Sequence, residues 1–149
     1  MSKRIKQALS SAVVTTAYPR SQIDIYLQVI ESDGADWSAC INAAGLALVD
    51  AGINLKDMVA ACEAAIIEDD SGPLIDPNHV ESSQSSVPQL SVTILPKLDK
   101  IISMEVSGRL HLDRLESGLI AAKNGAKLMF EQFDEVVKKR LSEMNNMQT

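Results

Sequence analysis

Apolar side chains recur along the chain with two different periods, and these periods predict the elements of the fold. A stripe with spacings of four and three predicts a helix over residues 1–16. The stripe consists of Ile5, Leu9, Ala12 and Val13. This helix is expected to end before Pro19, because the residue before a proline avoids the helical region. Residues 23–29 then alternate between apolar and polar, which predicts a strand with one face on a core.

The stretch from Glu31 to Gly52 predicts the end of that strand, a tight loop and a second helix. Asp33 and Gly34 form a turn signal, Asp36 is a candidate N-cap, and Gly52 is a candidate stop. Apolar residues lie on more than one side of this helix, which indicates that it is covered on more than one face. Anions favour the free N–H groups of a helix N-terminus, so the loop is a candidate anion site.

Four strands and one long helix are predicted in the second half of the chain. The predicted strands cover residues 59–67, 74–77, 90–94 and 101–106. The last two are expected to form an antiparallel hairpin. Residues 68–73 predict a turn, and the polar, serine-rich residues 78–87 predict a mobile loop. Residues 112–144 predict a helix whose Gly118 and Gly125 allow close packing on the sheet. The layout is α+β with a largely antiparallel sheet.

Charge and cysteine content narrow the functional classes. The chain carries 14 basic and 20 acidic residues, a net charge of −6. This balance argues against a free-standing nucleic-acid binder but leaves open RNA contact within a larger assembly. Cys40 and Cys62 lie in apolar segments and are expected to be core thiols rather than a disulfide. The sequence shows neither a signal peptide nor a membrane-spanning run, so we expect a cytosolic or nuclear protein.

Several segments, taken in order, resemble the ribonuclease PH family. These segments are residues 19–26, the Asp33-Gly34 loop, residues 42–44, residues 48–53 and residues 74–81. The resemblance runs from about Ile5 to Arg140 and covers only the C-terminal part of the family domain, without its N-terminal sheet. It implies an α+β, ribonuclease PH-like fold of the ribosomal protein S5 domain 2-like type, with helices packed on the sheet. We therefore expect one partial domain over residues 1–144 and a frayed tail over residues 145–149.

The same resemblance implies that the positions used for catalysis are degenerate. Active members hold the attacking phosphate with a Gly-Ser-Arg or Gly-Thr-Arg junction before the helix, and Ala35, Asp36 and Trp37 stand there in this chain. A carboxylate at Asp36 would repel phosphate. A further family arginine would fall before the first residue. Of an acidic pair spaced six apart, the chain keeps Asp76 and has Ser82 at the second place. No catalytic residues are expected.

The resemblance is strongest to the ring-forming members of the family in the RNA exosome. It implies a non-catalytic ring subunit that scaffolds the channel for 3′–5′ processing and degradation of RNA, including ribosomal RNA. Its partners would be the other ribonuclease PH-like subunits, the exosome cap proteins, an associated nuclease and RNA in the channel, in nucleus, nucleolus and cytoplasm, with no membrane. The alternatives are a residual phosphorolytic 3′–5′ exoribonuclease and a shortened isoform that acts only as an interaction module. No cofactor is expected, and His79 and His111 lack partners at metal-ligand spacing, so no metal site is predicted.

Individual side chains leave alternatives open. Trp37 either stacks on an RNA base or packs at the helix N-terminus. Asp76 is either a relic of catalysis or a strand-end acid that orders the following loop. Arg20, the candidate RNA-binding residue, either meets an RNA phosphate or pairs with Asp24. The basic residues 138–140 either complement the dipole at a helix C-terminus or contact RNA.

Overall fold

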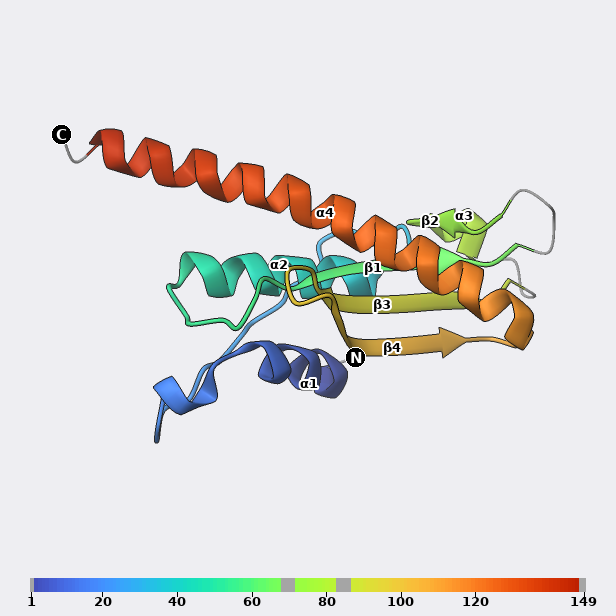
Figure 1. Cartoon of the computed structure of the whole chain (residues 1–149), viewed down its shortest axis with the longest axis horizontal. Coiled ribbons are helices and arrows are strands. Elements are labelled where there is room, and N and C mark those ends of the chain that lie inside the picture. The colour runs from blue at the N-terminus through green and yellow to red at the C-terminus, as the bar shows by residue number, and fades with distance from the viewer. Residues whose placement is uncertain (1, 68–71, 83–86, 148–149) are drawn as a thin grey trace.

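The structure, a computed structural model, describes residues 2–67, 72–82 and 87–147 (Figure 1). Its elements are α1 (Ser2–Ala12), the 3₁₀ helix η1 (Thr15–Ala17), α2 (Asp36–Asp50), β1 (Ala60–Ala65), β2 (Leu74–Ile75), α3 (His79–Ser82), β3 (Gln89–Leu95), β4 (Lys100–Ser107) and α4 (Leu112–Met147). The last four predicted strands and the long helix are confirmed. The turn predicted at 68–73 and the loop predicted at 78–87 lie partly outside the described residues.

One antiparallel sheet organises the described residues. Its strand order is β2-β1-β3-β4, and β3 and β4 form the predicted hairpin. The turn of this hairpin is held by Asp57, which is 7% exposed and accepts hydrogen bonds from the Lys97 and Leu98 N–H groups at 2.8 and 3.0 Å. The α+β layout predicted from the sequence is therefore correct.

Helices cover both faces of this sheet (Figure 1). On one face, α1 and α2 pack with Val59 and Ala61; on the other, α4 packs with Ala60, Cys62 and Ala64. All six residues of β1 are buried, because the strand is central and covered on both sides. Both cysteines are free thiols in the core, Cys40 in the cluster under α1 and α2 and Cys62 under α4, as predicted. Burial raises the pKa of the Cys62 thiol to about 11.

The glycines of α4 permit a close approach to the sheet. A Cβ atom at Gly118 would lie 2.5 Å from Cδ1 of Ile66, and one at Gly125 would lie 2.6 Å from Sγ of Cys62. The predicted role of both glycines in packing is thus confirmed. Gly52 also ends α2 as predicted: its φ is +69°, and the N–H groups of Gly52 and Ile53 bond back to the carbonyls of Val49 and Leu48.

The strand predicted at residues 23–29 is wrong. The segment is extended but has no strand partner among the described residues, and its apolar side chains are exposed by 37% at Ile25 and by 52% at Val29. An extended segment becomes a strand only when a neighbour accepts its ladder hydrogen bonds. The first helix is also shorter than predicted, since α1 ends at Ala12 and η1 follows.

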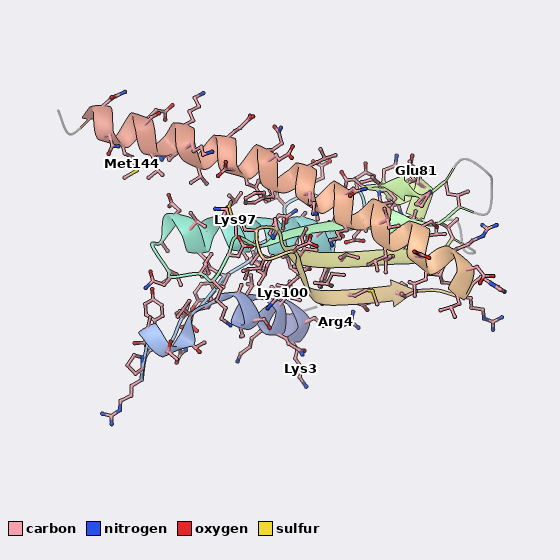
Figure 2. All side chains as sticks on the ribbon, viewed as in Figure 1. Lys3, Arg4, Glu81, Lys97, Lys100 and Met144 are labelled. Carbon is pink, nitrogen blue, oxygen red and sulfur yellow. The ribbon has the colours of Figure 1, made fainter. Side chains whose placement is uncertain are left out.

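The second half of α4 extends beyond the sheet, and Figure 2 shows Met144 near its far end. The helix continues to Met147, so the basic residues 138–140 do not lie in its last turn, which contains no basic residue. The interpretation of these residues as partners of the helix dipole is therefore wrong. Lys138 instead pairs with Asp134 one turn earlier, at 2.5 Å. Among the described residues, no helix is apolar over a length that would cross a membrane.

Candidate functional site

The loop before α2 packs against the backbone that leads into α3. Gly34 has a φ of +108°, and a Cβ atom there would lie 2.5 Å from the Pro77 carbonyl oxygen and 2.8 Å from the carbonyl carbon of Asn78. A side chain at this position would collide with the main chain, so the contact requires glycine. The contact brings the two loops predicted to carry family site residues side by side.

A cavity of about 260 Å³ lies between these loops. It is lined by Ser32, Gly34, Ala35, Asp36, Trp37, Glu63, His79, Ser82 and Gln89. The structure therefore brings together four of the five degenerate family positions singled out from the sequence. The fifth, Asp76, is exposed and does not line the cavity. Among the described residues, no lysine or arginine lines it either.

Helix α2 begins without a side-chain cap of its own. Ala35, not Asp36, is the N-cap residue, so the predicted cap is wrong. Ala35 adopts the left-handed conformation, with φ +51°, and has no side-chain oxygen to offer. Asp36 is the first helical residue, and its carboxylate accepts a hydrogen bond from the Ser32 hydroxyl at 2.6 Å. Asp36 thus adds negative charge to the rim of the cavity.

Trp37 is buried rather than presented to solvent. It is 7% exposed and belongs to the apolar cluster under α1 and α2. Its indole N–H is buried and has no hydrogen-bond partner among the described residues. An RNA base needs an open ring face to stack on, and the burial of Trp37 favours packing over stacking.

Glu63 is the feature of the cavity that sequence reasoning missed. It lies in the middle of β1, is 6% exposed, and accepts a hydrogen bond from the Ser38 N–H at 3.1 Å. Burial raises the pKa of Glu63, and the nearby Asp36 carboxylate raises it further, while the N–H groups of Ser38 and Trp37 and the Ser91 hydroxyl act in the opposite direction. A lone acid within the apolar run of residues 59–67 was the available signal.

The α3 side of the cavity is ordered by a reciprocal pair of caps. The Glu81 carboxylate accepts from the Asn78 N–H at 2.8 Å, and the Asn78 side chain accepts from the Glu81 N–H at 2.9 Å. Residues 79–82 are therefore helical, where the sequence predicted a loop. This short helix places His79 and Ser82 on the cavity wall. Asp76, with φ +56°, bonds back through its N–H to the Glu63 carbonyl at 2.9 Å.

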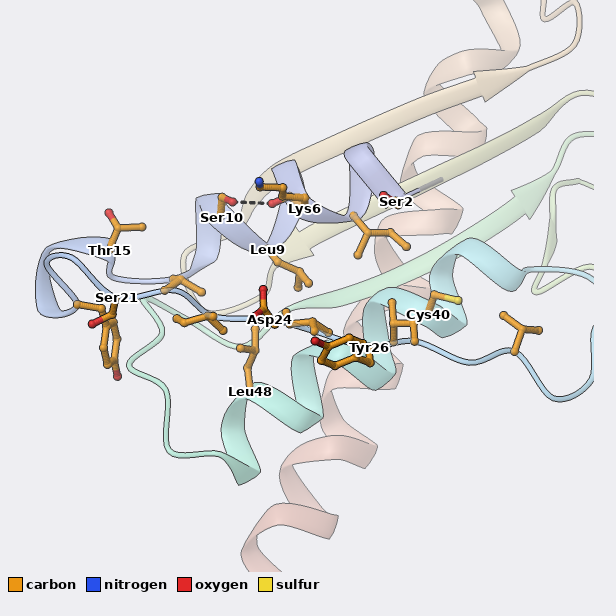
Figure 3. A pocket seen from close by; sticks show the side chains of 17 residues that line it. Ser2, Lys6, Leu9, Ser10, Thr15, Ser21, Asp24, Tyr26, Cys40 and Leu48 are labelled. Atoms are coloured by element: carbon orange, nitrogen blue, oxygen red, sulfur yellow. Dashed lines mark hydrogen bonds between the residues drawn. The ribbon is translucent and has the colours of Figure 1, made fainter.

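A second, larger cavity of about 750 Å³ lies away from this site, between α1, α2 and residues 23–29 (Figure 3). Most of its lining is apolar, including Ile5, Leu9 and Leu48. Asp24 accepts hydrogen bonds from the Gln22 side chain at 2.8 and 3.0 Å, and no ion pair joins it to Arg20, although both residues are described. Arg20 lines neither cavity.

The polar groups of the first cavity define what it can bind. It holds two carboxylates, one imidazole and no described cationic side chain of lysine or arginine. Within the described part of the chain, no group of three metal-ligating side chains gathers anywhere. Its electrostatic character is therefore opposite to that of a phosphate site.

Comparison with known proteins places this architecture. Two models, described as the 3′ exoribonuclease family domain 1 and domain 2, match residues 1–54 and 57–125. The chain belongs to this ribonuclease PH family. It is 41% identical over 143 residues to the human protein "Exosome complex component RRP41", a match covering 96% of this chain and 57% of that protein. It is 39% identical to the Arabidopsis thaliana homologue over 94% of this chain and 57% of that protein.

Solved structures agree with the family assignment. The crystal structure of rice (Oryza sativa) Rrp46 superposes with a TM-score of 0.73 at 27% identity, covering 88% of this chain and 62% of that one. The ribonuclease PH-like fold inferred from sequence segments is therefore confirmed. The chain spans a little over half the length of the curated relatives it matches, 57% for the human and Arabidopsis proteins.

Proposed function

We propose that this chain is a ring subunit of the RNA exosome that does not itself catalyse phosphorolysis. The similarity to proteins named exosome complex components, from human to the archaeon Methanopyrus kandleri, supports a place in the ring. The observation that carries the non-catalytic role is the pair of carboxylates, Asp36 and Glu63, in the cavity at the α2 N-terminus. That is where the family resemblance expects phosphate.

Charge repulsion gives the physical reason. Two like unit charges about 4 Å apart repel by about 4 kcal/mol at an effective dielectric constant near 20. A phosphate entering this cavity would meet such repulsion with no described lysine or arginine to offset it. The partners that this proposal requires are other ribonuclease PH-like subunits, cap proteins, a separate nuclease and RNA in the channel. Nuclear, nucleolar and cytoplasmic residence, testable by imaging of the tagged chain, belongs to the same proposal.

Reconstitution tests both the membership of the ring and the non-catalytic role. The purified chain is mixed with the other ring subunits, assembly is followed by size-exclusion chromatography with light scattering, and RNA shortening is assayed with and without inorganic phosphate. We expect a complex and no release of nucleoside diphosphates. Phosphate-dependent shortening that Asp76→Asn abolishes would overturn the non-catalytic role. Failure to join any ring subunit would overturn membership.

The open apolar cavity beside residues 23–29 favours a second candidate, an interaction module that binds one ring subunit without closing a ring. The same chromatography separates the two, because a module would stop at a two-chain complex. A chain that stays monomeric with and without ring subunits would count against this second candidate.

A further inference from the structure

Glu63 is directed toward α2 by the alternation of β1. Odd-numbered neighbours of this strand, such as Val59 and Ala61, face α1 and α2, while Ala60 and Cys62 face α4. The Glu63 side chain extends from the same face and reaches the Ser38 N–H at 3.1 Å. With only 6% of Glu63 exposed, its carboxylate is a fixed internal group rather than a surface charge.

The first turn of α2 needs an acceptor that its own N-cap cannot provide. The first helical hydrogen bond runs from the Ala39 N–H to the Ala35 carbonyl at 3.1 Å, so the preceding N–H groups have no partner within the helix. Ala35 has no side-chain oxygen. The Glu63 carboxylate accepts a hydrogen bond from the Ser38 backbone N–H. The backbone N–H of Trp37 and the Ser91 hydroxyl also favour the ionised form of Glu63. These are the donors that an incoming anion at this helix end would use.

We propose that the Glu63 carboxylate is a built-in anion that occupies the N-terminus of α2 and keeps inorganic phosphate out of the adjoining cavity. The inference rests on the proposed non-catalytic role and assigns a specific residue to it. It differs from a purely structural cap in one consequence: shortening the side chain frees the Ser38 and Trp37 N–H groups toward the cavity, and phosphate takes the vacated place. Asp36, whose carboxylate is held by Ser32, remains in the variant and limits the affinity gained.

The test is a titration with inorganic phosphate followed by calorimetry and by the amide spectrum of α2. We expect no saturable phosphate binding by the wild-type chain. Glu63→Ser should bind phosphate at least about tenfold more tightly than any affinity the wild type shows. The reason is that charge-assisted hydrogen bonds from the freed N–H groups are each worth about 1.5–3 kcal/mol. Asp36→Ser should create no comparable site. Glu116→Ser, which removes an exposed carboxylate of α4, is the charge-matched control and should behave as wild type.

Three outcomes decide against the proposal: Glu63→Ser that folds, by circular dichroism, but binds phosphate no better than wild type; Asp36→Ser that gains as much affinity; or a gain shared by Glu116→Ser. These outcomes are independent of ring assembly. A chain that enters the ring while Glu63→Ser gains nothing overturns this inference alone. A chain that joins no ring subunit while Glu63→Ser gains a phosphate site overturns only the proposed function.

The wild-type chain provides a second measurement that needs no variant to fold. If the Glu63 carboxylate accepts the Ser38 N–H, the chemical shift of that amide proton should follow the ionisation of Glu63 during a pH titration. The midpoint should lie above 4.5, the ordinary value for a glutamate, because burial opposes ionisation. A Ser38 amide that does not respond to pH would remove the contact on which the proposal depends.

Discussion

At the scale of single residues, Glu63 shows how burial ties an ionisable group to stability. Its pKa is raised in the folded chain, so the folded state holds the proton more tightly than the unfolded state. The free energy of unfolding should therefore fall as the pH rises from about 4.5 through the folded pKa. In Glu63→Gln this fall should be absent. The melting temperature of the variant should therefore rise relative to that of the wild type as the pH is increased from acidic to neutral. If the melting temperatures of the two proteins changed with pH in parallel, the raised pKa of Glu63 would be contradicted.

Asn42 acts as a short substitute for a strand. Its side-chain amide donates to the Ala61 carbonyl at 2.9 Å and accepts from the Ala61 N–H at 2.7 Å, where β2 does not reach. Asn42→Ala would leave both main-chain groups buried without partners, at a cost of about 2–4 kcal/mol in the free energy of unfolding. Urea unfolding measures this loss. The control Asn124→Ala, at an exposed position of α4, should change stability by less than about 0.5 kcal/mol.

At the scale of elements, the contact of α4 with β1 depends on Gly125. A Cβ atom there would lie 2.6 Å from Sγ of Cys62 and 2.9 Å from Cγ2 of Ile75. Gly125→Ala should destabilise the chain by about 1–3 kcal/mol, because overpacking outweighs the gain of about 1 kcal/mol in helix propensity. Combining it with Cys62→Ala should recover part of the loss in chemical denaturation. If the loss of stability in the double variant equalled the sum of the losses in the two single variants, the two positions would be uncoupled.

The segment at 23–29 shows where period-two patterns stop being informative. The apolar residues Ile23, Ile25 and Leu27 of this alternation do line one cavity, but Asp24 and Tyr26 from the intervening positions line it as well. The alternation could not reveal whether a neighbouring strand is present, because pairing depends on other parts of a chain or on another chain. The hairpin of β3 and β4 was predictable because a short turn joins the two strands, and the end of α2 was predictable because Gly52 is a local stop signal.

This unpaired segment should make the isolated chain self-associate. Exposed apolar residues on an extended segment are a template for pairing with another copy. Ile25→Lys should shift light scattering toward the monomer at a given concentration, because a charge on the apolar face opposes pairing. Gln28→Lys, which adds the same charge at an exposed position outside the cavity, is the matched control and should have a smaller effect. If both variants associate as wild type does, the segment is not the contact.

At the scale of the whole molecule, the candidate site was only partly predictable. The sequence identified the Ala35–Trp37 junction and Ser82, because their positions follow a family pattern. It did not identify Glu63 as part of the site, since that acid meets Ser38 across 25 positions of sequence and only the packing of α2 on β1 joins them. Asp76 matched the pattern but its backbone turns away at φ +56°, outside the cavity. Such placements arise from the tertiary fold rather than from local sequence.

The length of α4 relative to the sheet has a consequence for how the molecule can be cut. Its 36 residues extend about 54 Å at about 1.5 Å per residue, whereas the eight residues of β4 cover only about 27 Å. Beyond Phe133 the described side chains of the helix are exposed or half-buried. Once these last turns unwind, a protease that cleaves after lysine or arginine should cut at residues 138–140 without disturbing the sheet. The last turns would leave as a short peptide, while both apolar clusters remained intact in the trimmed product.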